Sequence, residues 1–470
     1  MIKKIKKNIY EIPKEGEMNV KGIVYASSKI IEGIKKDKTI EQIKNVASLP
    51  GIIDKSIALA DAHQGYGFSI GGVAAFDMEK GIISPGGVGY DINCSVRLIR
   101  TNIKKKEFIK KQKEVARILR ERIPSGIGRG SPFQISYKEL DKLLKGGSQY
   151  LIKKGYGKEE DYLHTEEEGK LKNTDPSKVS DRAKKRGIGQ IGTLGAGNHF
   201  LDVLVVEKVF DNAAAKAYGI SKDQIVIMIH CGSRGLGHQV ASDYIKLMEE
   251  KYGFEHLKDR ELINAPIKSK LGRDYLSAMN CAANFAFANK QMLTQFTREA
   301  IKEIFPHSEL EVVYDICHNI AKIEKHKVGK AIKEVCVHRK GATRSLGPGR
   351  IEVPIKYRKV GQPVMIPGSM GTSSYLMRGT KKSEELSFSS TVHGAGRVMS
   401  RSKATRELNY EKIKKELQNK KIEICSGSKR GLIEEAPENY KEIDEVVESI
   451  DYLGLSKKVA KMKPIIVIQG

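Results

Sequence analysis

The chain has 470 residues, of which 40% are hydrophobic, so it can fold around a sizeable core. Its 83 Lys and Arg against 57 Asp and Glu give a net charge of +26, which favours polyanionic partners, above all nucleic acid; a generally lysine-rich proteome is the alternative explanation. Six widely spaced cysteines exclude a disulfide framework, and no apolar run is long enough for a secretory leader or a membrane span, so we expect a cytoplasmic protein with reduced thiols.

The first part of the chain combines strands with glycine-rich loops. Residues 39–77 predict a short helix and then a strand that runs into Asp61-Ala62-His63-Gln64-Gly65. A glycine-dense stretch follows from Gly81 to Cys94, where the backbone can approach a ligand closely. Residues 104–122 have the apolar spacing of a basic amphipathic helix. Residues 143–190 are polar and turn-rich, and they predict a long surface excursion.

The second part contains several strands that end at a histidine. The apolar runs 225–229, 311–317 and 334–337 predict strands that end at His230, His318 and His338, and residues 272–304 predict a long helix. Two more loop signatures, at 367–372 and 393–397, lie in the last third. No linker-like change of composition divides the chain. We therefore predict the α+β class, as a single large mixed α/β domain over residues 1–470.

The histidine loops predict a metal centre. His199, His230 and His318 each lie at a predicted strand end beside Asn, Gly, Ser or Arg, and strand ends present functional groups on a rigid frame. Asp91 and Cys94 lie three residues apart in the glycine-rich stretch, so the set offers O, S and N ligands for a transition metal. There is no CxxC pair and no HExxH helix, so these ligands must converge from distant parts of the chain.

Two nucleotide chemistries are excluded by the absence of their motifs. The sequence has no GxxxxGK[ST] phosphate loop. It also has no Lys-x-Asp-Gly motif, which carries the lysine nucleophile of ordinary nucleotidyl-transferring ligases. If the protein forms a nucleotidyl-enzyme, its nucleophile is therefore another residue.

Seven motifs, in order from about residue 60 to the C-terminus, resemble those of the RtcB family of RNA ligases. They are Asp91-x-x-Cys94, Gly-Asn198-His199-Phe200, His230-x-Gly-Ser-Arg234-Gly-x-Gly, His318-Asn319, His338-Arg-Lys340-Gly-Ala-Thr-Arg344, Pro-Gly-Ser369-Met-Gly-Thr and His393-Gly-Ala-Gly-Arg397. The resemblance implies a metal centre in a central cleft, and a ligase that joins RNA 3′-phosphate or 2′,3′-cyclic phosphate ends to 5′-hydroxyl ends in tRNA splicing and RNA repair. It implies two Mn²⁺ ions and GTP as cofactors.

The resemblance assigns a role to each matching residue. Cys94 would bridge the two manganese ions, with His230 and His318 completing one site and Asp91 and His199 the other. His393 would attack the α-phosphate of GTP and carry GMP. The residues expected to contact the nucleotide are Asn198, Phe200, Asp202, Ser369, Ser374, Ala395, Gly396 and Gln469. The residues expected to bind phosphates of GTP or RNA are Arg234, Lys340 and Arg397, although both arginines could instead be structural ion-pair partners.

Two positions depart from the family pattern. Asp202 stands where the family usually has Glu, and Gln469 where it has Lys, so the choice between GTP and ATP stays open. The implied partners are RNA, with tRNA exon halves foremost, and archease as a helper protein. Two other readings remain: a metal-dependent phosphoesterase that acts on RNA ends, and an RNA-binding module without chemistry. A phosphoesterase needs no His393, and an RNA-binding module leaves the Asp, Cys and His loops unexplained.

Overall fold

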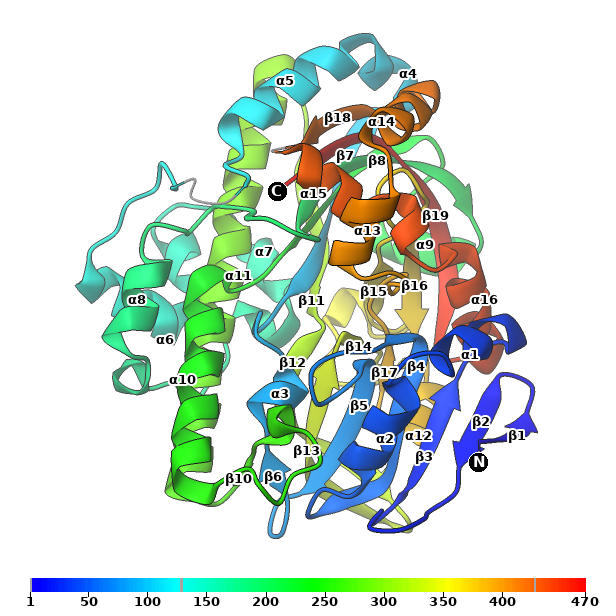
Figure 1. Cartoon of the computed structure of the whole chain (residues 1–470). Helices are drawn as coiled ribbons and strands as arrows, with labels where there is room; N and C mark the ends of the chain where they lie inside the picture. The colour runs from blue at the N-terminus through cyan, green and yellow to red at the C-terminus, as the bar shows by residue number, and fades with distance from the viewer. Residues whose placement is uncertain (1, 127–129, 427) are drawn as a thin grey trace.

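Two large β-sheets form the centre of the computed structural model, which describes residues 2–126, 130–426 and 428–470 (Figure 1). Within these residues the first sheet has seven strands in the order β1-β2-β3-β4-β5-β13-β12. Its strands are β1 (Lys3–Lys6), β2 (Ile9–Ile12), β3 (Lys21–Tyr25), β4 (Ile52–His63), β5 (Ile70–Asp77), β12 (Asn319–Val328) and β13 (Ala331–Lys340).

The second sheet has eight described strands, in the order β11-β7-β9-β8-β19-β16-β15, with β18 paired to β19. They are β7 (Ser95–Lys104), β8 (Phe200–Val209), β9 (Gln224–Cys231), β11 (Leu310–Cys317), β15 (Pro363–Ile366), β16 (Ser374–Gly379), β18 (Glu423–Ser426) and β19 (Ser456–Gln469). Two short pairs complete the strands: β6 (Ile82–Ile83) with β10 (Ala265–Pro266), and β14 (Ala342–Arg344) with β17 (Ser390–Val392).

Helices cover the outer faces of the sheets (Figure 1). In the first half of the chain they are α1 (Ser28–Ile34), α2 (Thr39–Ala47), α3 (Pro85–Val88), α4 (Lys105–Phe108), α5 (Gln112–Arg122), α6 (Tyr137–Lys153), α7 (Glu159–Leu163), α8 (Asp181–Gly187) and α9 (Asn212–Tyr218). In the second half they are α10 (Arg234–Tyr252), α11 (Lys270–Ile304), α12 (Lys382–Ser387), α13 (Arg401–Glu407), α14 (Tyr410–Asn419), α15 (Lys429–Glu434) and α16 (Ile443–Leu453).

The core lies between the two sheets and behind each of them. Along β9, Val226 and Met228 belong to the cluster between the sheets, whereas Ile225, Ile227 and Ile229 belong to the cluster beneath α5 and α11. Successive side chains of a strand point to opposite faces, so a wholly apolar strand fits a sheet that is covered on both sides. The cluster between the sheets takes residues from both ends of the chain. The mixed α/β prediction is confirmed.

The predicted elements with strong periodicity are present. The helix and strand expected in residues 39–77 are α2 and β4, the expected long helix is α11, and the three apolar runs that end at histidines are β9, β11 and β13. The basic helix expected over residues 104–122 is interrupted. Its first residues form α4 and a 3₁₀ turn, and α5 begins only after Lys111, whose backbone (φ −119°, ψ 9°) leaves the helical region.

Residues 143–190 differ from the expected surface excursion. Helix α6 packs against α11 and buries Leu143, Leu144 and Leu151. Farther along, the buried carboxylate of Glu166 lies 2.6 Å from the Lys322 ammonium and accepts a hydrogen bond from the backbone N–H of Cys317 (2.8 Å). Glu166 is charged because it has a buried cationic partner, although other charged side chains of the segment, such as Glu159 and Lys170, are exposed. Composition alone does not distinguish these two cases. No helix in the described residues has the length and apolar character needed to cross a membrane.

The buried ion pair between Arg298 of α11 and Asp161 of α7 predicts a stability effect. Both guanidinium–carboxylate bonds measure 2.6 Å, and the two side chains are 8% and 2% exposed. Arg298→Met leaves Asp161 buried without its cation, so we expect a loss of about 3–5 kcal/mol in the free energy of unfolding, measured by denaturant titration. Arg117→Met, which breaks the exposed pair with Glu121, is the control and should leave the midpoint unchanged. Equal midpoints for the two variants would contradict the prediction.

Candidate metal centre and adjoining pocket

Four neighbouring strands bring the predicted ligands to one edge of the second sheet. The order β11-β7-β9-β8 is antiparallel throughout, so strand starts and strand ends alternate along that edge. Cys94 precedes β7, His199 precedes β8, His230 lies at the end of β9, and His318 follows β11. The four side chains therefore meet although they are up to 224 residues apart in the sequence (318 − 94).

The Cys94 thiol lies at the centre of this cluster. Its Sγ is 3.2 Å from Nε2 of His230 and 3.4 Å from Nε2 of His199. His230 Nε2 is 3.2 Å from His318 Nε2, and His199 Nε2 is 2.8 Å from Oδ2 of Asp91. Two groups could each hold a metal ion, Cys94 with His230 and His318, and Cys94 with Asp91 and His199. The Cys94 sulfur belongs to both groups.

The donor atoms of the cluster fit cations. His199 Nδ1 donates to the carbonyl oxygen of Leu194 (3.1 Å), and its Nε2 faces the Asp91 carboxylate at 2.8 Å. Without a metal, a proton on Nε2 joins the two groups, and a cation that replaces this proton would meet a nitrogen and an oxygen ligand. The facing Nε2 atoms of His230 and His318 cannot both carry a proton without repulsion. A cation between such acceptors satisfies all of them, as imidazole, thiolate and carboxylate ligands do around transition metals.

Burial dominates the electrostatics of the cluster. It raises the pKa of the Cys94 thiol well above its usual range, and the Asp91 carboxylate raises it further. Burial and the neighbouring imidazoles lower the pKa of His230 and of His318 well below the usual range, so both rings are neutral. Burial also opposes ionisation of Asp91, but His199 and Arg234 outweigh it and bring that pKa to about 2. A neutral buried thiol becomes a thiolate only where positive charge is supplied.

Backbone contacts hold the loop that carries Asp91 and Cys94. The His318 N–H donates to the Cys94 carbonyl (2.9 Å), and the Asn93 N–H donates to the Asn319 carbonyl (2.8 Å). The Asn319 side chain donates to the Asp91 carbonyl (3.2 Å). Asn93 itself has φ +52°, and its amide donates to the Ala283 carbonyl of α11 (2.8 Å). The loop is thus fixed from β11, β12 and α11 together.

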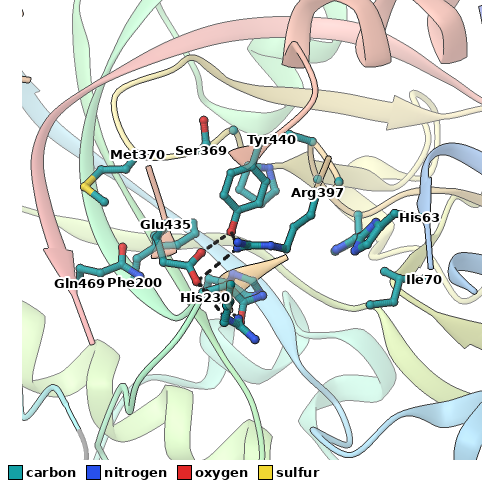
Figure 2. A pocket seen from close by; sticks show the side chains of 18 residues that line it. His63, Ile70, Phe200, His230, Ser369, Met370, Arg397, Glu435, Tyr440 and Gln469 are labelled. Atoms are coloured by element: carbon teal, nitrogen blue, oxygen red, sulfur yellow. Dashed lines mark hydrogen bonds and ion pairs between the residues drawn. The ribbon is translucent and has the colours of Figure 1, made fainter. Parts of the chain in front are cut away.

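A pocket adjoins the cluster and shares His230 with it. Phe200 and Gln469 line one side of the pocket, next to Met370, and His63 lines the other side (Figure 2). Of the predicted nucleotide and phosphate contacts, the pocket brings together Asn198, Phe200, Ser369, Ala395, Gly396, Arg397 and Gln469.

His393 lies between the pocket and the cluster. It lines the pocket, and its ring centroid is 5.0 Å from that of His318. Asp61, on β4, fixes its orientation, since one carboxylate oxygen accepts from the His393 backbone N–H (2.9 Å) and pairs with its Nδ1 (2.6 Å). With Nδ1 held in this way, Nε2 is the ring atom left for a substrate.

A polar group crosses the middle of the pocket. Arg397 donates to the Tyr440 hydroxyl (3.1 Å) and lies 3.5 Å from Glu435, and Tyr440 in turn donates to Glu435 (Figure 2). Burial and Glu435 raise the pKa of Tyr440, so its hydroxyl keeps the proton. Within the described chain, Nη2 of Arg397 is buried without a hydrogen-bond partner. That nitrogen therefore keeps donor capacity that its neighbours do not use.

Four predicted contacts lie outside the pocket lining: Lys340, Ser374, Asp202 and Arg234. The buried Lys340 ammonium donates to the carbonyls of Tyr66 and Phe68, so it holds that loop rather than facing the pocket. Ser374 is buried, and its hydroxyl accepts from the Gly368 N–H (3.1 Å). Asp202 lies on the same face of β8 as Phe200 but deeper. Among the described residues its Oδ1 has no partner, and burial raises its pKa well above the usual range.

Arg234 lies behind the metal cluster. Its Nε donates to the Thr193 hydroxyl (3.3 Å), and its Nη1 is 3.5 Å from Nδ1 of His199. The guanidinium occupies the space that a Cβ on Gly195 would fill, only 1.9 Å from that position, so glycine is required there. Arg234 has φ +54°, a conformation that non-glycine residues rarely adopt and that concentrates at functional sites.

Several residues of the site carried no decisive sequence signal. Asp61 and His63 belong to a segment that the sequence predicts as a strand end. However, the partner of Asp61 is His393, 332 residues away. Met370 stands inside a predicted motif without an assigned role. Glu435 and Tyr440 lie in a polar region without a recognisable motif. Cys231, Cys281, Cys317 and Cys336 are buried free thiols in apolar clusters, as expected.

Comparison with known proteins gives one consistent result. The sequence model of the family described as tRNA-splicing ligase RtcB matches residues 42–470. The tRNA-splicing ligase RtcB of Thermococcus kodakarensis is 50% identical over 478 residues, which cover 100% of this chain and 99% of the relative. Those of Methanococcus maripaludis and Pyrobaculum aerophilum are each 48% identical, over 478 and 480 residues, with the same coverage.

The sharing of the Cys94 sulfur by both ligand groups predicts how many metal ions each ligand substitution removes. We expect the wild-type protein to bind two Mn²⁺ ions, and Cys94→Ala to lose both, because its Sγ belongs to both ligand groups. His318→Ala removes a ligand of one group and should lose one ion. Metal content is measured by elemental analysis after gel filtration. Cys231→Ala, which removes the buried thiol next to His230, is the matched control and should keep both ions. A Cys94→Ala variant that retains one ion would refute the bridging role.

Proposed function

This chain belongs to the RtcB family of tRNA-splicing ligases, and we propose that it joins RNA ends in a manganese- and GTP-dependent reaction through a histidine–GMP intermediate. The ends joined are an RNA 3′-phosphate or 2′,3′-cyclic phosphate and a 5′-hydroxyl. RNA ligation in tRNA splicing is what family membership supports directly. The cofactors, the end chemistry and the covalent intermediate are the finer parts of the proposal.

The observation that carries the proposal is the placement of His393. Its ring lies against the metal-ligand cluster on one side and lines the pocket on the other, with Nδ1 paired to Asp61 at 2.6 Å. A carboxylate at Nδ1 fixes the tautomer in which Nε2 carries a lone pair, and it stabilises the positive charge that develops when Nε2 forms a bond. This is the arrangement that a histidine nucleophile requires.

The metal ligands follow from the two groups that share Cys94. His230 and His318 would hold one Mn²⁺ with Cys94, and Asp91 and His199 would hold the second with the same sulfur. When bound, the two ions supply positive charge that neutralises phosphate oxygens beside His393. His199 is oriented for this role by the Leu194 carbonyl, which fixes its Nδ1–H.

In the first step His393 Nε2 attacks the α-phosphorus of GTP. The new P–N bond forms as the bond to the β-phosphate oxygen breaks, and pyrophosphate leaves with the electron pair. The Nδ1–H stays with His393 and faces the Asp61 carboxylate, so the ring carries its positive charge beside a fixed negative charge. Arg397, with a buried unpartnered Nη2 in the pocket, is placed to bind a phosphate oxygen.

In the later steps GMP passes from His393 to RNA. An oxygen of the RNA 3′-phosphate attacks the phosphorus, the P–N bond breaks, and the lone pair returns to Nε2. The 5′-hydroxyl oxygen of the second RNA then attacks the 3′-phosphorus and gives up its proton to solvent, while the bond to GMP breaks and GMP leaves with the electron pair. A 2′,3′-cyclic phosphate end would first be opened by water. Asn198, exposed at the pocket, and Arg234, beside His199, are the residues we assign to the RNA phosphates and ends.

The guanine base would lie at the Phe200 side of the pocket. The register of β8 with β19 pairs Phe200 with Gln469, and Asp202 with Val467. The Gln469 amide donates to the carbonyls of Gly197 and His199, which leaves its Oε1 as an acceptor. Asp202 is the second acceptor. Its Oδ1 lacks a partner in the described chain, and burial favours its protonated form, so the donors of guanine would favour its ionisation. Acceptors suit the N1–H and N2–H donors of guanine. Ser369, Ala395 and Gly396 would contact the rest of the nucleotide.

The alternative function is a metal-dependent phosphoesterase that acts on RNA ends. It would use the same ligands, but it has no need of a histidine held by a carboxylate between metal cluster and pocket. The Asp61–His393 pair therefore favours the ligase. The free cysteines fit a reducing cytoplasm, where Cys94 stays available as a ligand. Association with archease stays a prediction from the family.

The covalent step predicts a labelled protein. We expect wild-type protein incubated with α-labelled GTP and Mn²⁺ to retain the label on a denaturing gel, and His393→Ala to retain none, because the P–N bond forms at its Nε2. His238→Ala removes an exposed histidine of α10 outside the pocket lining and is the control that should label normally. Label that persists in His393→Ala would reject this nucleophile, and an unlabelled wild type that hydrolyses RNA ends would favour the phosphoesterase.

The buried carboxylate predicts the choice of base. Asp202→Asn removes a group that can ionise and offer two acceptor oxygens to the N1–H and N2–H donors of guanine. We therefore expect the half-saturating GTP concentration in the labelling reaction to rise about 10–100-fold. The concentration for ATP should change little, because adenine has no N1–H or N2–H donor. Asp202→Glu keeps the carboxylate and should keep the preference for GTP. Equal changes for both nucleotides in Asp202→Asn would show that this residue does not read the base.

A further inference from the structure

The strand that carries Asp61 is irregular where Asp61 lies. β4 pairs with β3 as far as Ala58 and with β5 at Ala58 and again at His63, and the register shifts between these two points. Asp61 therefore lies in a stretch of β4, between Ala58 and His63, where no regular pairing with β3 or β5 holds the strand. Its carboxylate nevertheless needs a fixed position, because it fixes both the backbone and the ring of His393.

Lys441 replaces the missing strand contacts. It lies between the 3₁₀ turn Pro437–Asn439 and α16, and its ammonium donates to the carbonyls of Ala60 (3.0 Å) and Ala62, the residues on either side of Asp61. Its backbone N–H donates to the Gly396 carbonyl (2.9 Å), three residues after His393. One residue thus ties the strand of Asp61 to the loop of His393.

The strand and the loop touch through their backbones. Gly396 has φ +75°, and a Cβ at this position would lie 2.0 Å from the Asp61 carbonyl oxygen. The two segments therefore pack without an intervening side chain, and a shift of β4 at Asp61 moves the carboxylate relative to the His393 ring. A hydrogen bond of 2.6 Å leaves little room for such a shift.

The Lys441 ammonium is also a partly buried charge. Burial lowers its pKa to about 8, while the carboxylates of Asp61 and Asp37 act in the opposite direction. Buried lysines are rare in folded proteins unless a partner holds them. Here the two carbonyls supply hydrogen bonds, and Asp61 supplies opposite charge. The ammonium is thus placed to hold the acid of the Asp61–His393 pair.

We propose that Lys441 is a positioning residue for the nucleotidyl-transfer step, which acts by holding Asp61 in register with His393. The inference rests on the proposed function, because it requires His393 to be the nucleophile. Lys441 is absent from the pocket lining, so it should affect the rate of transfer and not the binding of GTP. Supporting residues of this kind typically change activity about 10–100-fold.

The test measures single-turnover labelling of the full-length protein with α-labelled GTP and Mn²⁺. For Lys441→Met we expect the maximal rate to fall about 10–100-fold while half-saturating GTP and metal content stay unchanged. Lys441→Arg should recover much of the rate, because a guanidinium can donate to both carbonyls. The matched control is Lys55→Met. Lys55 is also on β4, six residues before Asp61, and its ammonium also donates to a backbone carbonyl, that of Glu385 (3.0 Å). It should label at the wild-type rate.

A double-mutant cycle with Asp61→Asn separates positioning from general stability. If Lys441 acts through Asp61, Lys441→Met should change the rate little once Asp61 is already replaced. If the rate losses of the two single variants multiply in the double variant, the inference is overturned. It is also overturned if Lys441→Met labels at the wild-type rate, or if it loses GTP binding instead of rate. If Lys441→Met does not fold, Lys441→Gln, which keeps an N–H donor, takes its place in the cycle. An unlabelled wild type would overturn the proposed function as well, whereas a normal wild type beside a normal Lys441→Met overturns this inference alone.

Discussion

The arrangement around the Cys94 sulfur is the constraint on which the rest of the structure depends. A thiol, a carboxylate and three imidazoles lie within 3.4 Å of one another in a chain of contacts, and four of the five are buried. Burial keeps the Cys94 thiol and the rings of His230 and His318 neutral, so their sulfur and nitrogen donor atoms lie in contact with no positive charge on any of the three. Such a group is unfavourable unless cations join it, and the surrounding fold has to hold it in place.

The fold meets this demand with the alternating ends of antiparallel strands. Since β7, β9, β8 and β11 are neighbours, one edge of the sheet receives ligands from four distant segments, while apolar residues on both faces of the sheet fix the strands. The same logic extends to His393. It comes from the other side, after the short strand β17, and Asp61 from the first sheet holds it. The candidate metal ligands belong to one sheet, and Asp61, which holds the proposed nucleophile His393, belongs to the other. The proposed site therefore depends on how the two sheets pack.

The sequence predicts well where strands end, but it predicts poorly which side chains or carbonyls the polar residues at those ends contact. His230 and His318 follow apolar runs that are strands for local reasons, and the order of the motifs indicates the family. The role of Asp61 depends on a contact 332 residues away, which no local pattern contains. Lys340 was expected to bind phosphate, but two backbone carbonyls hold its ammonium, and carbonyl positions are a property of the fold. Within residues 143–190, which are expected on the surface, Glu166 is buried instead, since Lys322 rather than water matches its charge.

The net charge of +26 explains attraction to RNA but not recognition inside the pocket. There the cations are already partly neutralised, because Arg397 and Arg401 both lie within 3.5 Å of Glu435 and Tyr440 joins the same group. A guanidinium held in this way has one orientation, so a phosphate meets a donor that loses little side-chain entropy on binding. The Glu435 carboxylate weakens the attraction of Arg397 for an anion. The contacts of Arg397 with Glu435 and Tyr440 nevertheless fix the direction of its buried Nη2. The pocket therefore offers a cation of fixed position rather than a strong, unpaired one, and a fixed position is what the proposed in-line transfer at His393 would require.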